Sequence, residues 1–570
     1  MGCEIARSPS TPVVPGRTGD GPSEARKHWA AGRTGPCWAP DRFTAGRMQT
    51  GKPPAEEVRR KRRPGFLGTV TLATTAAAVA LALVGAGAGG ASGTRALPQD
   101  AAAHSPAAKG PPPVPVSVDV NLSDPGRPVP SGYLGLSFEV TDLAQIASYG
   151  ERGDLVSMLR SLGPGLLRFG GVSSDTQIAW TDSRTPAPRW ATRLLEARDF
   201  RLLRVLAQQS GWKVLLTVGL AHYDPEAAAR EVAAAKAALG PWLQGVEVGN
   251  EPDAYGRHGL RSGSWDFQHY AQQVDSYRHA IAALAPGVPL AGPGVSGSRV
   301  YIRWGPREAA TQQPLMLTGH HYPLGCHQHP APSIARLLSG AIRSEEEESL
   351  DRYMAVSRAT GIPFRMDEAG SVSCGGEAGI SNTFAAALWA ANYIAQSMDA
   401  EVSGINLEGN PANCLGYSPV CAARPKKLAE GALTAQPAWY ALLLTKGLVG
   451  DRPVRSSVAK TGGAANVSVS ALLAPGGGLR LLVAEEEPSD HGGVSLTLHV
   501  GSQFSSATVL ALRAPSLKAT SGVTLGGSSV SAAGSWSPPA SLPRIPVHAG
   551  VVSVRIPAAS AALISVNPAG

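Results

Sequence analysis

The stretch that decides the fold is GVEVGNEPD, residues 245–253, which starts as an alternating apolar strand and stops on an amide, a carboxylate and a proline. Val246 and Val248 predict a strand with one packed face. Pro252 has no backbone N–H to give to a ladder, so the strand must end before it. Asn250 and Glu251 therefore sit side by side at the end of a buried strand, where packing alone does not account for them.

Seven further strand signals flank this one and alternate with helical patterns over about 310 residues, in the size range of a barrel of about 250 residues with insertions. The predicted strands are 133–139, 165–171, 213–220, 245–250, 289–295, 316–322, 363–368 and 404–408. The predicted helices include 151–161, 191–209, 225–239, 266–284, 345–359 and 380–398. Eight strands that alternate with helices predict an α/β fold, a (β/α)8 TIM barrel over residues 116–448.

The helical pattern stops near residue 449, and short alternating runs such as ANVSVSALLA and GVSLTLHV follow, separated by Gly, Ser and Pro. This spacing predicts an appended C-terminal all-β sandwich over residues 449–570. The run VPVSVDVNL at 114–122 has no partner among the eight barrel strands. We expect it to pair with the sandwich.

The formal charge of +8 is concentrated at the N-terminus. Residues 1–66 hold 13 Lys/Arg and 6 Asp/Glu, a net of +7, which leaves 38 and 37 for the other residues, a net of +1. A body that is close to neutral excludes nucleic acid as the expected partner and disfavours a long polyanion such as heparan sulfate, which needs an extended basic groove.

The first 91 residues have the parts of an export signal. Residues 1–65 are basic and rich in Pro and Gly without periodicity, so we expect disorder there, with Met48 as an alternative start. Residues 66–91 are apolar and contain small residues fit for cleavage, and 92–115 have the composition of a linker. We predict a secreted protein and favour cleavage over a membrane anchor, while the Sec and twin-arginine routes both stay open.

Four of the six cysteines lie in the body, at Cys326, Cys374, Cys414 and Cys421. In an exported domain an even number predicts two disulfides. Cys326 and Cys374 follow neighbouring strands, and Cys414 and Cys421 flank a short loop, but cross pairing is an alternative. The histidines near Cys326 suggest a metal site instead, yet their spacing matches no known ligand pattern, so we predict no metal and no cofactor.

Two predicted strands end in a glutamate: the fourth at Glu251 and the seventh at Glu368. Strand C-termini surround the active-site face of a TIM barrel, and strands four and seven lie on opposite sides of its mouth. Two carboxylates that face each other across a pocket are what glycoside hydrolysis requires, one protonated to assist the leaving group and one ionised to attack the anomeric carbon. Helix capping or a salt bridge is the non-catalytic alternative for either residue.

The segments at the strand ends resemble glycoside hydrolase family 79, the family of heparanase and bacterial β-glucuronidases. The matching segments, in the order of the family, are GLSFE (135–139), LRFGGVSSD (167–175), GNEPD (249–253), GHHYPL (319–324), MDEAG (366–370) and YSPV (417–420). The resemblance covers residues 116–570 and implies a retaining (β/α)8 glycosidase.

The resemblance assigns Glu251 as the acid/base and Glu368 as the nucleophile. It implies substrate or carboxylate contacts from Asn250, Tyr322, Glu139, Asp175 and Tyr417, with Asp175 alternatively a helix cap. Arg168, inside its strand, is expected to support a carboxylate beneath the pocket rather than to touch substrate.

Two departures from the family pattern concern the sugar. In the loop after Glu368 the glycines Gly375 and Gly376 persist, but Ser373 stands where the family has a tyrosine that receives the uronate carboxylate. At the eighth strand Glu408 replaces the family histidine, and an ionised Glu408 would repel a uronate.

We therefore predict an exported, monomeric, retaining glycosidase that cleaves terminal β-linked glucuronic acid or a related sugar from a glycoside or oligosaccharide. The alternatives are a glycosidase of the same clan for a neutral sugar, such as a xylosidase or glucosidase, and a non-catalytic carbohydrate-binding surface protein.

Overall fold

The computed structural model describes residues 111–460 and 465–569. The predicted leader, the signal segment and most of the predicted linker lie outside these residues. Within the part that is described, no helix combines the length and apolar character that a membrane span needs.

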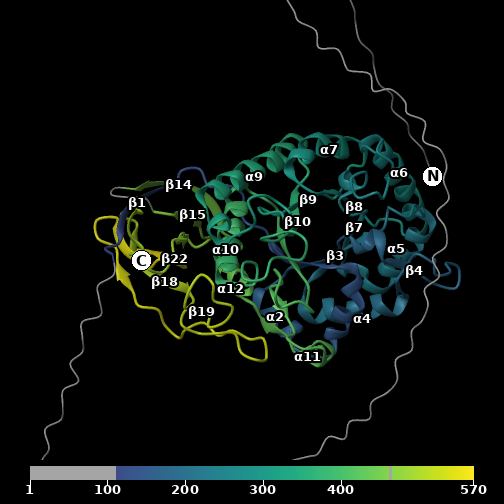
Figure 1. Cartoon of the computed structure of the whole chain (residues 1–570). Helices are drawn as coiled ribbons and strands as arrows, with labels where there is room; N and C mark the ends of the chain where they lie inside the picture. Colours follow the sequence, from purple (N-terminus) through teal and green to yellow (C-terminus); the bar gives the residue numbers. More distant parts are fainter. Residues whose placement is uncertain (1–110, 461–464, 570) are drawn as a thin grey trace, which may run out of the picture. The chain divides into compact units, whose positions relative to one another are not determined.

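Eight parallel strands close into a barrel (Figure 1). They are β2 (Leu134–Glu139), β3 (Leu166–Gly170), β6 (Lys213–Val218), β7 (Leu243–Val248), β8 (Leu290–Val295), β9 (Met316–His321), β10 (Phe364–Ala369) and β11 (Ile405–Gly409). The order around the barrel follows the chain, and β11 closes it by pairing with β2. The predicted TIM-barrel fold is confirmed.

A helix follows each barrel strand. These helices are α2 (Leu155–Leu162), α4 (Ala197–Ser210), α5 (Pro225–Leu239), α6 (Phe267–Leu284), α7 (Ser298–Thr311), α9 (Gly340–Thr360), α10 (Phe384–Asp399) and α12 (Pro437–Thr445). The smaller elements between strands and helices are α1 (Leu143–Ala147), α3 (Ser173–Thr176), β4 (Ile178–Trp180), β5 (Arg193–Leu195), α8 (Ile334–Leu337), β12 (Val420–Cys421), α11 (Pro425–Glu430) and β13 (Thr434–Ala435).

The helix predicted from residue 191 begins at Ala197 instead. Residues 193–195 form strand β5, which pairs with β4. The Asp199 carboxylate accepts a hydrogen bond from the backbone N–H of Glu196 at 2.9 Å, and the two side chains form a reciprocal capping box at the helix start. The cap sets the start of the helix at Ala197, although the apolar periodicity predicted an earlier start.

The barrel interior changes from apolar to polar along the strands. Leu166, Leu215, Ala291 and Met316 form a small buried cluster of their own. Two residues further along three of these strands, the same face carries Arg168, Thr217 and Thr318. The apolar layer closes the lower part of the barrel, and the polar layer above it supports the strand ends at the mouth.

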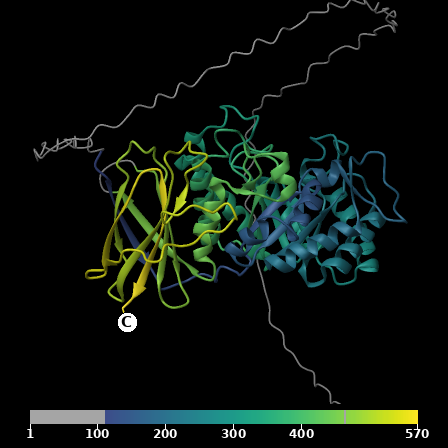
Figure 2. The ribbon, with the colours of Figure 1, turned by 90° about the horizontal axis from the view of Figure 1, so that it is seen from below.

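The C-terminal region forms one ten-stranded sheet (Figure 2). Its strands are β1 (Val114–Asn121), β14 (Arg452–Lys460), β15 (Val467–Leu473), β16 (Leu479–Glu485), β17 (Val494–His499), β18 (Phe504–Arg513), β19 (Thr524–Leu525), β20 (Ile545–Pro546), β21 (Val551–Ile556) and β22 (Ser560–Pro568). Strand β14 pairs with β15 through its first residues and with β1 through its last. Alternate residues from both halves share one apolar core, so the sheet folds over as a sandwich.

Strand β1 lies in this sheet, between β14 and β17, although the barrel separates it from them in sequence (Figure 1). The two regions also meet through side chains. Arg343 of α9 forms an ion pair with the buried Glu486 at 2.8 Å and donates a hydrogen bond to Asn466 at 2.9 Å. The barrel and the sandwich are therefore joined at both ends of the barrel sequence and by this ion pair.

Two disulfides form, as predicted, between Cys326 and Cys374 and between Cys414 and Cys421. The first crosses from the loop after β9 to the loop after β10. The second closes the loop that carries Tyr417. Both lie on the side of the barrel where the strands end.

We expect the two disulfides to differ in their effect on stability. They span 48 and 7 residues of sequence. In the chain-entropy model, loss of the long loop closure costs about 4 kcal/mol and loss of the short one about 2 kcal/mol. Denaturant unfolding of Cys326→Ser/Cys374→Ser, compared with Cys414→Ser/Cys421→Ser, measures the difference. Four free thiols in an unreduced tryptic digest would contradict both pairings.

Candidate active site

The end of β7 is tied to two neighbouring segments, which fix Asn250 and Glu251. The backbone N–H of Asn250 donates to the Asp175 carboxylate at 2.9 Å, and that of Glu251 donates to the Gly294 carbonyl at 2.9 Å. Glu251 has φ 47° and ψ 51°, a left-handed conformation that is uncommon for a residue other than glycine. The strained turn therefore aims the Glu251 side chain, and the hydrogen bonds around it hold the strain.

A register shift in β10 brings two consecutive acidic residues to one place. The pairing of β10 with β9 and with β11 is interrupted after Met366. Asp367 and Glu368 are both buried, and both carboxylates contact the guanidinium of Arg168. In a regular strand two successive side chains would point to opposite faces, so the bulge re-aims Glu368 into the barrel mouth.

Arg168 of β3 is fully buried and organises the site. Its Nε donates to Glu247 at 3.0 Å and lies 3.0 Å from an Asp367 oxygen. Nη1 donates to Ser137 and Glu368, Nη2 donates to Asn250, and Nη2 lies 3.3 Å from His320 Nε2. Arg168 thus lies beneath the carboxylates, as the sequence predicted.

The two oxygens of Glu368 have separate partners. Arg168 donates to one at 2.6 Å, and the phenol of Tyr322 donates to the other at 2.8 Å. Burial alone would raise the pKa of Glu368, but the nearby His320 and Arg168, with the Tyr322 hydrogen bond, hold this pKa below its usual value. Glu368 is therefore kept ionised.

His320 lies between Glu251 and Glu368. Its Nδ1 is 2.9 Å from Glu251 Oε1 and 3.7 Å from Glu368 Oε2, while Nε2 faces Arg168. Burial lowers the pKa of His320, but Glu368, the Glu251 hydrogen bond and Asp367 together raise it to about 10. Nδ1–H donates to Glu251 and fixes the position of that carboxyl group.

The nearest carboxylate oxygens of Glu251 and Glu368 lie within 4.8 Å of each other. The side chain of Glu251 is 24% exposed, whereas that of Glu368 is 10% exposed. One carboxyl group therefore reaches solvent at the mouth, and the other is held below it among hydrogen-bond donors.

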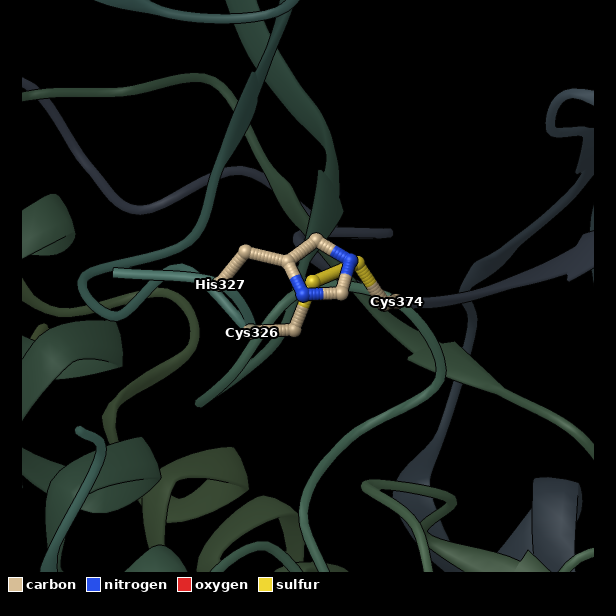
Figure 3. Close-up of side chains that lie close together, drawn as sticks. All are labelled: Cys326, His327 and Cys374. Atoms are coloured by element: carbon tan, nitrogen blue, oxygen red, sulfur yellow. A yellow bond between two sulfur atoms is a disulfide. The ribbon is translucent and has the colours of Figure 1, made fainter. Parts of the chain in front are cut away.

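Among the residues that the structure describes, two side-chain groupings have donor atoms suited to a metal. In the first, Cys326, His327 and Cys374, the two sulfur atoms are bonded to each other, so they are not thiolate ligands (Figure 3). The second is Glu251, His320 and Glu368. A metal requires a neutral imidazole, and the raised pKa of His320 opposes that form.

Glu139 and Glu408 add two acidic groups at the same end of the barrel. Burial raises the pKa of Glu139, although its carboxylate accepts a hydrogen bond from the Ser173 backbone at 2.9 Å. A Cβ atom at Gly171 would lie 2.3 Å from this carboxylate, so only glycine fits there, at φ +73°. Glu408 is 4% exposed, and burial, followed by repulsion from Glu368 and Glu139, raises its pKa well above the usual value.

Asp175 is buried and holds backbone groups. Its carboxylate accepts hydrogen bonds from the N–H groups of Leu220, Ala221 and Asn250 at 2.7 to 2.9 Å. These bonds use both oxygens, which leaves little capacity for a sugar hydroxyl. The geometry indicates that Asp175 positions the ends of β6 and β7. This role differs from the predicted sugar contact and from the predicted helix cap.

The loop with Ser373, Gly375 and Gly376 packs against Tyr417. The Ser373 hydroxyl accepts from the Cys326 backbone at 3.1 Å, so it anchors the disulfide loop. A Cβ at Gly376 would lie 2.7 Å from the Tyr417 backbone nitrogen. The ring of Tyr417 lies 5.9 Å from that of Tyr322, next to Glu368. The structure brings Tyr417 to the mouth but turns the Ser373 hydroxyl toward the loop.

Sequence reasoning missed three members of this cluster. His320 was considered only as a metal ligand, and Glu247 and Asp367 were not considered. For Glu247 the alternation V-E-V, which places it opposite Val246 and Val248, was a usable signal. For Asp367 no signal existed, because the bulge that turns it inward is not visible in the sequence.

Residues 482–563 match the model of the glycosyl hydrolase family 79 C-terminal beta domain. No curated protein sequence matches the chain. Among solved structures, a 4-O-α-L-rhamnosyl-β-D-glucuronidase from Fusarium oxysporum aligns with a TM-score of 0.62 and 16% identity, over 79% of this chain and 100% of the other.

A family 51 arabinofuranosidase from Xanthomonas axonopodis pv. citri aligns with a TM-score of 0.58 and 15% identity, over 80% of this chain and 100% of the other. At these identities the structures show a shared fold, and the family match is confined to residues 482–563 of the β domain. The predicted resemblance to glycoside hydrolase family 79 is thereby confirmed for that domain, and the barrel shares the fold of known glycoside hydrolases.

Proposed function

We propose that the chain is a retaining glycoside hydrolase that removes terminal β-linked glucuronate, with Glu368 as the nucleophile and Glu251 as the acid/base. The observation that carries the proposal is the pair of carboxylates with oxygens within 4.8 Å of each other. Retaining enzymes hold the two groups about 5 to 5.5 Å apart, whereas inverting enzymes need about 6.5 to 9.5 Å to admit a water molecule.

In the first step one oxygen of Glu368 attacks the anomeric carbon as the bond to the leaving oxygen breaks. Glu251 transfers its proton to that oxygen, and a covalent glycosyl–enzyme forms. Arg168 and Tyr322 hold the attacking carboxylate in one orientation through its two oxygens. His320 holds one oxygen of Glu251, which leaves the other to carry the proton.

In the second step Glu251, now ionised, takes a proton from water. The water oxygen bonds to the anomeric carbon, the bond to Glu368 breaks, and the proton restores Glu251 for the next cycle. Two displacements keep the β configuration. The amide –NH2 of Asn250 is free to donate to a sugar hydroxyl, because Arg168 already occupies its Oδ1.

A uronate as the cleaved sugar is supported by the charge state of Glu408. The sequence suggested an anion at this position, which would repel a uronate. Burial and two neighbouring carboxylates raise the pKa of Glu408 well above its usual value, which favours its neutral form and reduces that repulsion. The Fusarium oxysporum enzyme that shares this fold is a β-glucuronidase, which agrees with this choice.

A neutral sugar remains the second candidate, and one observation favours it. Among the site residues the permanent cation is Arg168, and its N–H groups are already engaged by Glu247, Ser137, Glu368 and Asn250. A uronate carboxylate would then depend on Tyr417 and on backbone N–H groups near Gly375 and Gly376.

Export is the expected setting for this activity, because the two disulfides persist in oxidising compartments. We propose a secreted monomer that needs no cofactor, since two carboxylates suffice for the double displacement.

Glu368→Ala should abolish turnover, because no other group can form the glycosyl–enzyme. We expect kcat to fall by roughly 10⁴-fold or more. Added azide should restore part of the activity and give an α-glycosyl azide, since the anion attacks once from the side that Glu368 vacated. A β-configured product from azide would argue against the assignment.

Glu251→Ala should affect substrates according to their leaving groups. For a leaving group that needs a proton we expect a loss of about 10²- to 10⁴-fold. For a dinitrophenyl glycoside, whose leaving group departs unprotonated, the glycosylation step should change little. Steady-state and burst kinetics on both substrates measure this contrast, and equal losses on the two would refute the acid/base role.

Glu408→Gln tests the neutral state of Glu408. In the wild type the raised pKa favours the protonated form, and the proton is lost as the pH rises through that pKa. Activity on an aryl β-glucuronide should therefore decline at alkaline pH, and the decline should be smaller in Glu408→Gln, whose amide cannot ionise. The pH profile of kcat/KM for both proteins is the measurement. A variant that loses most activity at pH 6 would show that the wild-type carboxyl acts as an anion.

A further inference from the structure

The two disulfides differ in their access to solvent. In the first, Cys374 is exposed and Cys326 is partly exposed. In the second, Cys414 is partly exposed but Cys421 is fully buried. Thiol–disulfide exchange requires a thiolate to reach one of the two sulfur atoms. The Cys326–Cys374 bond is therefore the more accessible of the two.

An imidazole lies beside the accessible disulfide (Figure 3). A ring nitrogen of the exposed His327 and the sulfur atoms of Cys326 and Cys374 all lie within 4.8 Å of one another. Exchange releases a thiolate, and an imidazole at this distance can supply a proton to it or, when charged, stabilise its negative charge. The arrangement favours exchange, and His327 takes no part in the glycosidase steps above.

The disulfide holds the first residue of a left-handed turn. Hydrogen bonds tie the two loops together as far as Ser373, whose N–H donates to Leu324 at 3.0 Å and whose hydroxyl accepts from Cys326 at 3.1 Å. Beyond it, residues 374–376 have φ values of 60°, 90° and 89°. Cys374 is the non-glycine residue of this run, and the left-handed region disfavours a residue with a Cβ. The disulfide therefore stabilises a backbone conformation that Cys374 does not favour by itself.

This turn packs on the loop that the second disulfide closes. Gly416 has no room for a Cβ, because the Gly375 carbonyl oxygen occupies that place. A Cβ at Gly376 would lie 2.7 Å from the backbone nitrogen of Tyr417. The two backbones are thus in direct contact, so a shift of residues 374–376 changes the space that Tyr417 occupies.

Tyr417 is connected in turn to the proposed nucleophile. Gly370 lies between two aromatic rings, since a Cβ on it would be 2.7 Å from Tyr322 Cε1 and 3.0 Å from Tyr417 Cδ1. The Tyr322 phenol donates to Glu368 at 2.8 Å. A continuous set of contacts therefore joins the accessible disulfide to the carboxylate that attacks the sugar.

From the accessible disulfide, its neighbouring imidazole and these contacts we propose that Cys326 and Cys374 form a redox switch, in which the active site is complete only while the two are bonded to each other. The proposal rests on the proposed function for the reaction that it controls. The reaction partner of the switch is a dithiol/disulfide couple, and the oxidised form belongs to an oxidising compartment.

Reduction takes two exchanges. A thiolate of the dithiol attacks the sulfur of the exposed Cys374, the S–S bond breaks, and Cys326 leaves as a thiolate that takes a proton from His327 or from water. The second thiolate of the reductant then attacks the reductant sulfur of the mixed disulfide, and Cys374 leaves and is protonated. The products are two cysteine thiols and the oxidised, cyclic form of the reductant. The reverse sequence closes the switch.

The test titrates folded wild type with dithiothreitol, traps free thiols with iodoacetamide and follows kcat/KM on p-nitrophenyl β-glucuronide and β-glucoside. We expect Cys326 and Cys374 to be alkylated before Cys414 and Cys421, and kcat/KM on the hydrolysed probe to fall in parallel by about tenfold or more. Oxidised dithiothreitol should restore the bond and the activity. Thermal unfolding of the partly reduced protein checks that the fold persists.

Two variants separate the switch from a general loss of stability. His327→Ala should slow the reduction of Cys326–Cys374 by about threefold or more, whereas the same change at His548, an exposed histidine of the sandwich, is the matched control and should not. Tyr322→Phe already lacks the phenol that holds Glu368, so reduction should change its kcat/KM by less than about twofold. A loss in Tyr322→Phe as large as that in wild type would contradict the switch.

Reduction of Cys326–Cys374 that leaves kcat/KM unchanged, or reduction of the other disulfide first, would overturn the switch while the proposed function stands. If the oxidised protein hydrolyses neither probe, the proposed function fails, and the labelling still decides the exchange site. Selective alkylation of Cys326 and Cys374 that His327→Ala slows supports it, and alkylation of all four cysteines together refutes it.

Discussion

The structure depends on one buried guanidinium. Arg168 has no solvent exposure, and its partners come from β2, β7, β9 and β10, around most of the barrel. A buried cation is costly unless every N–H is satisfied, and a buried acid is costly unless a cation is near. The contacts of Arg168 therefore complete the polar layer of the barrel. They also favour the ionised form of Glu368, which we propose as the nucleophile.

Charge in this layer is distributed unevenly. Glu247 and Glu368, the two carboxylates whose pKa is lowered, both accept hydrogen bonds from Arg168, and Glu368 also lies near His320. Burial raises the pKa of Asp367 to about 8 and that of Glu408 well above its usual value. Arg168 and His320 thus stabilise the ionised forms of Glu247 and Glu368, whereas burial favours the protonated forms of Asp367 and Glu408. The sequence alone, which shows only a surplus of acidic residues, cannot reveal this division.

Strand periodicity predicted those features of the fold that depend on the local sequence. The eight strands, their order and the polar residues at their ends follow from alternation and from proline and glycine positions. The bulge at Asp367, the left-handed turn at Glu251 and the inward face of His320 depend on pairing between strands that are distant in sequence. Asp175 illustrates the limit: its motif predicted a sugar contact, but three backbone N–H groups already occupy its carboxylate.

The buried acids of this layer have a consequence for the chemistry. A bound uronate would add one negative charge to a region of low dielectric constant that already contains Glu247 and Glu368, the carboxylates whose pKa is lowered. In the ground state that charge is unfavourable, because the free N–H donors are few. At the transition state the anomeric carbon becomes positive, and the uronate and Glu368 both lie close to it. The added anion would then be stabilised more in the transition state than in the bound substrate, which is the condition for faster turnover. A neutral sugar would bind without the initial cost but would also lack this gain.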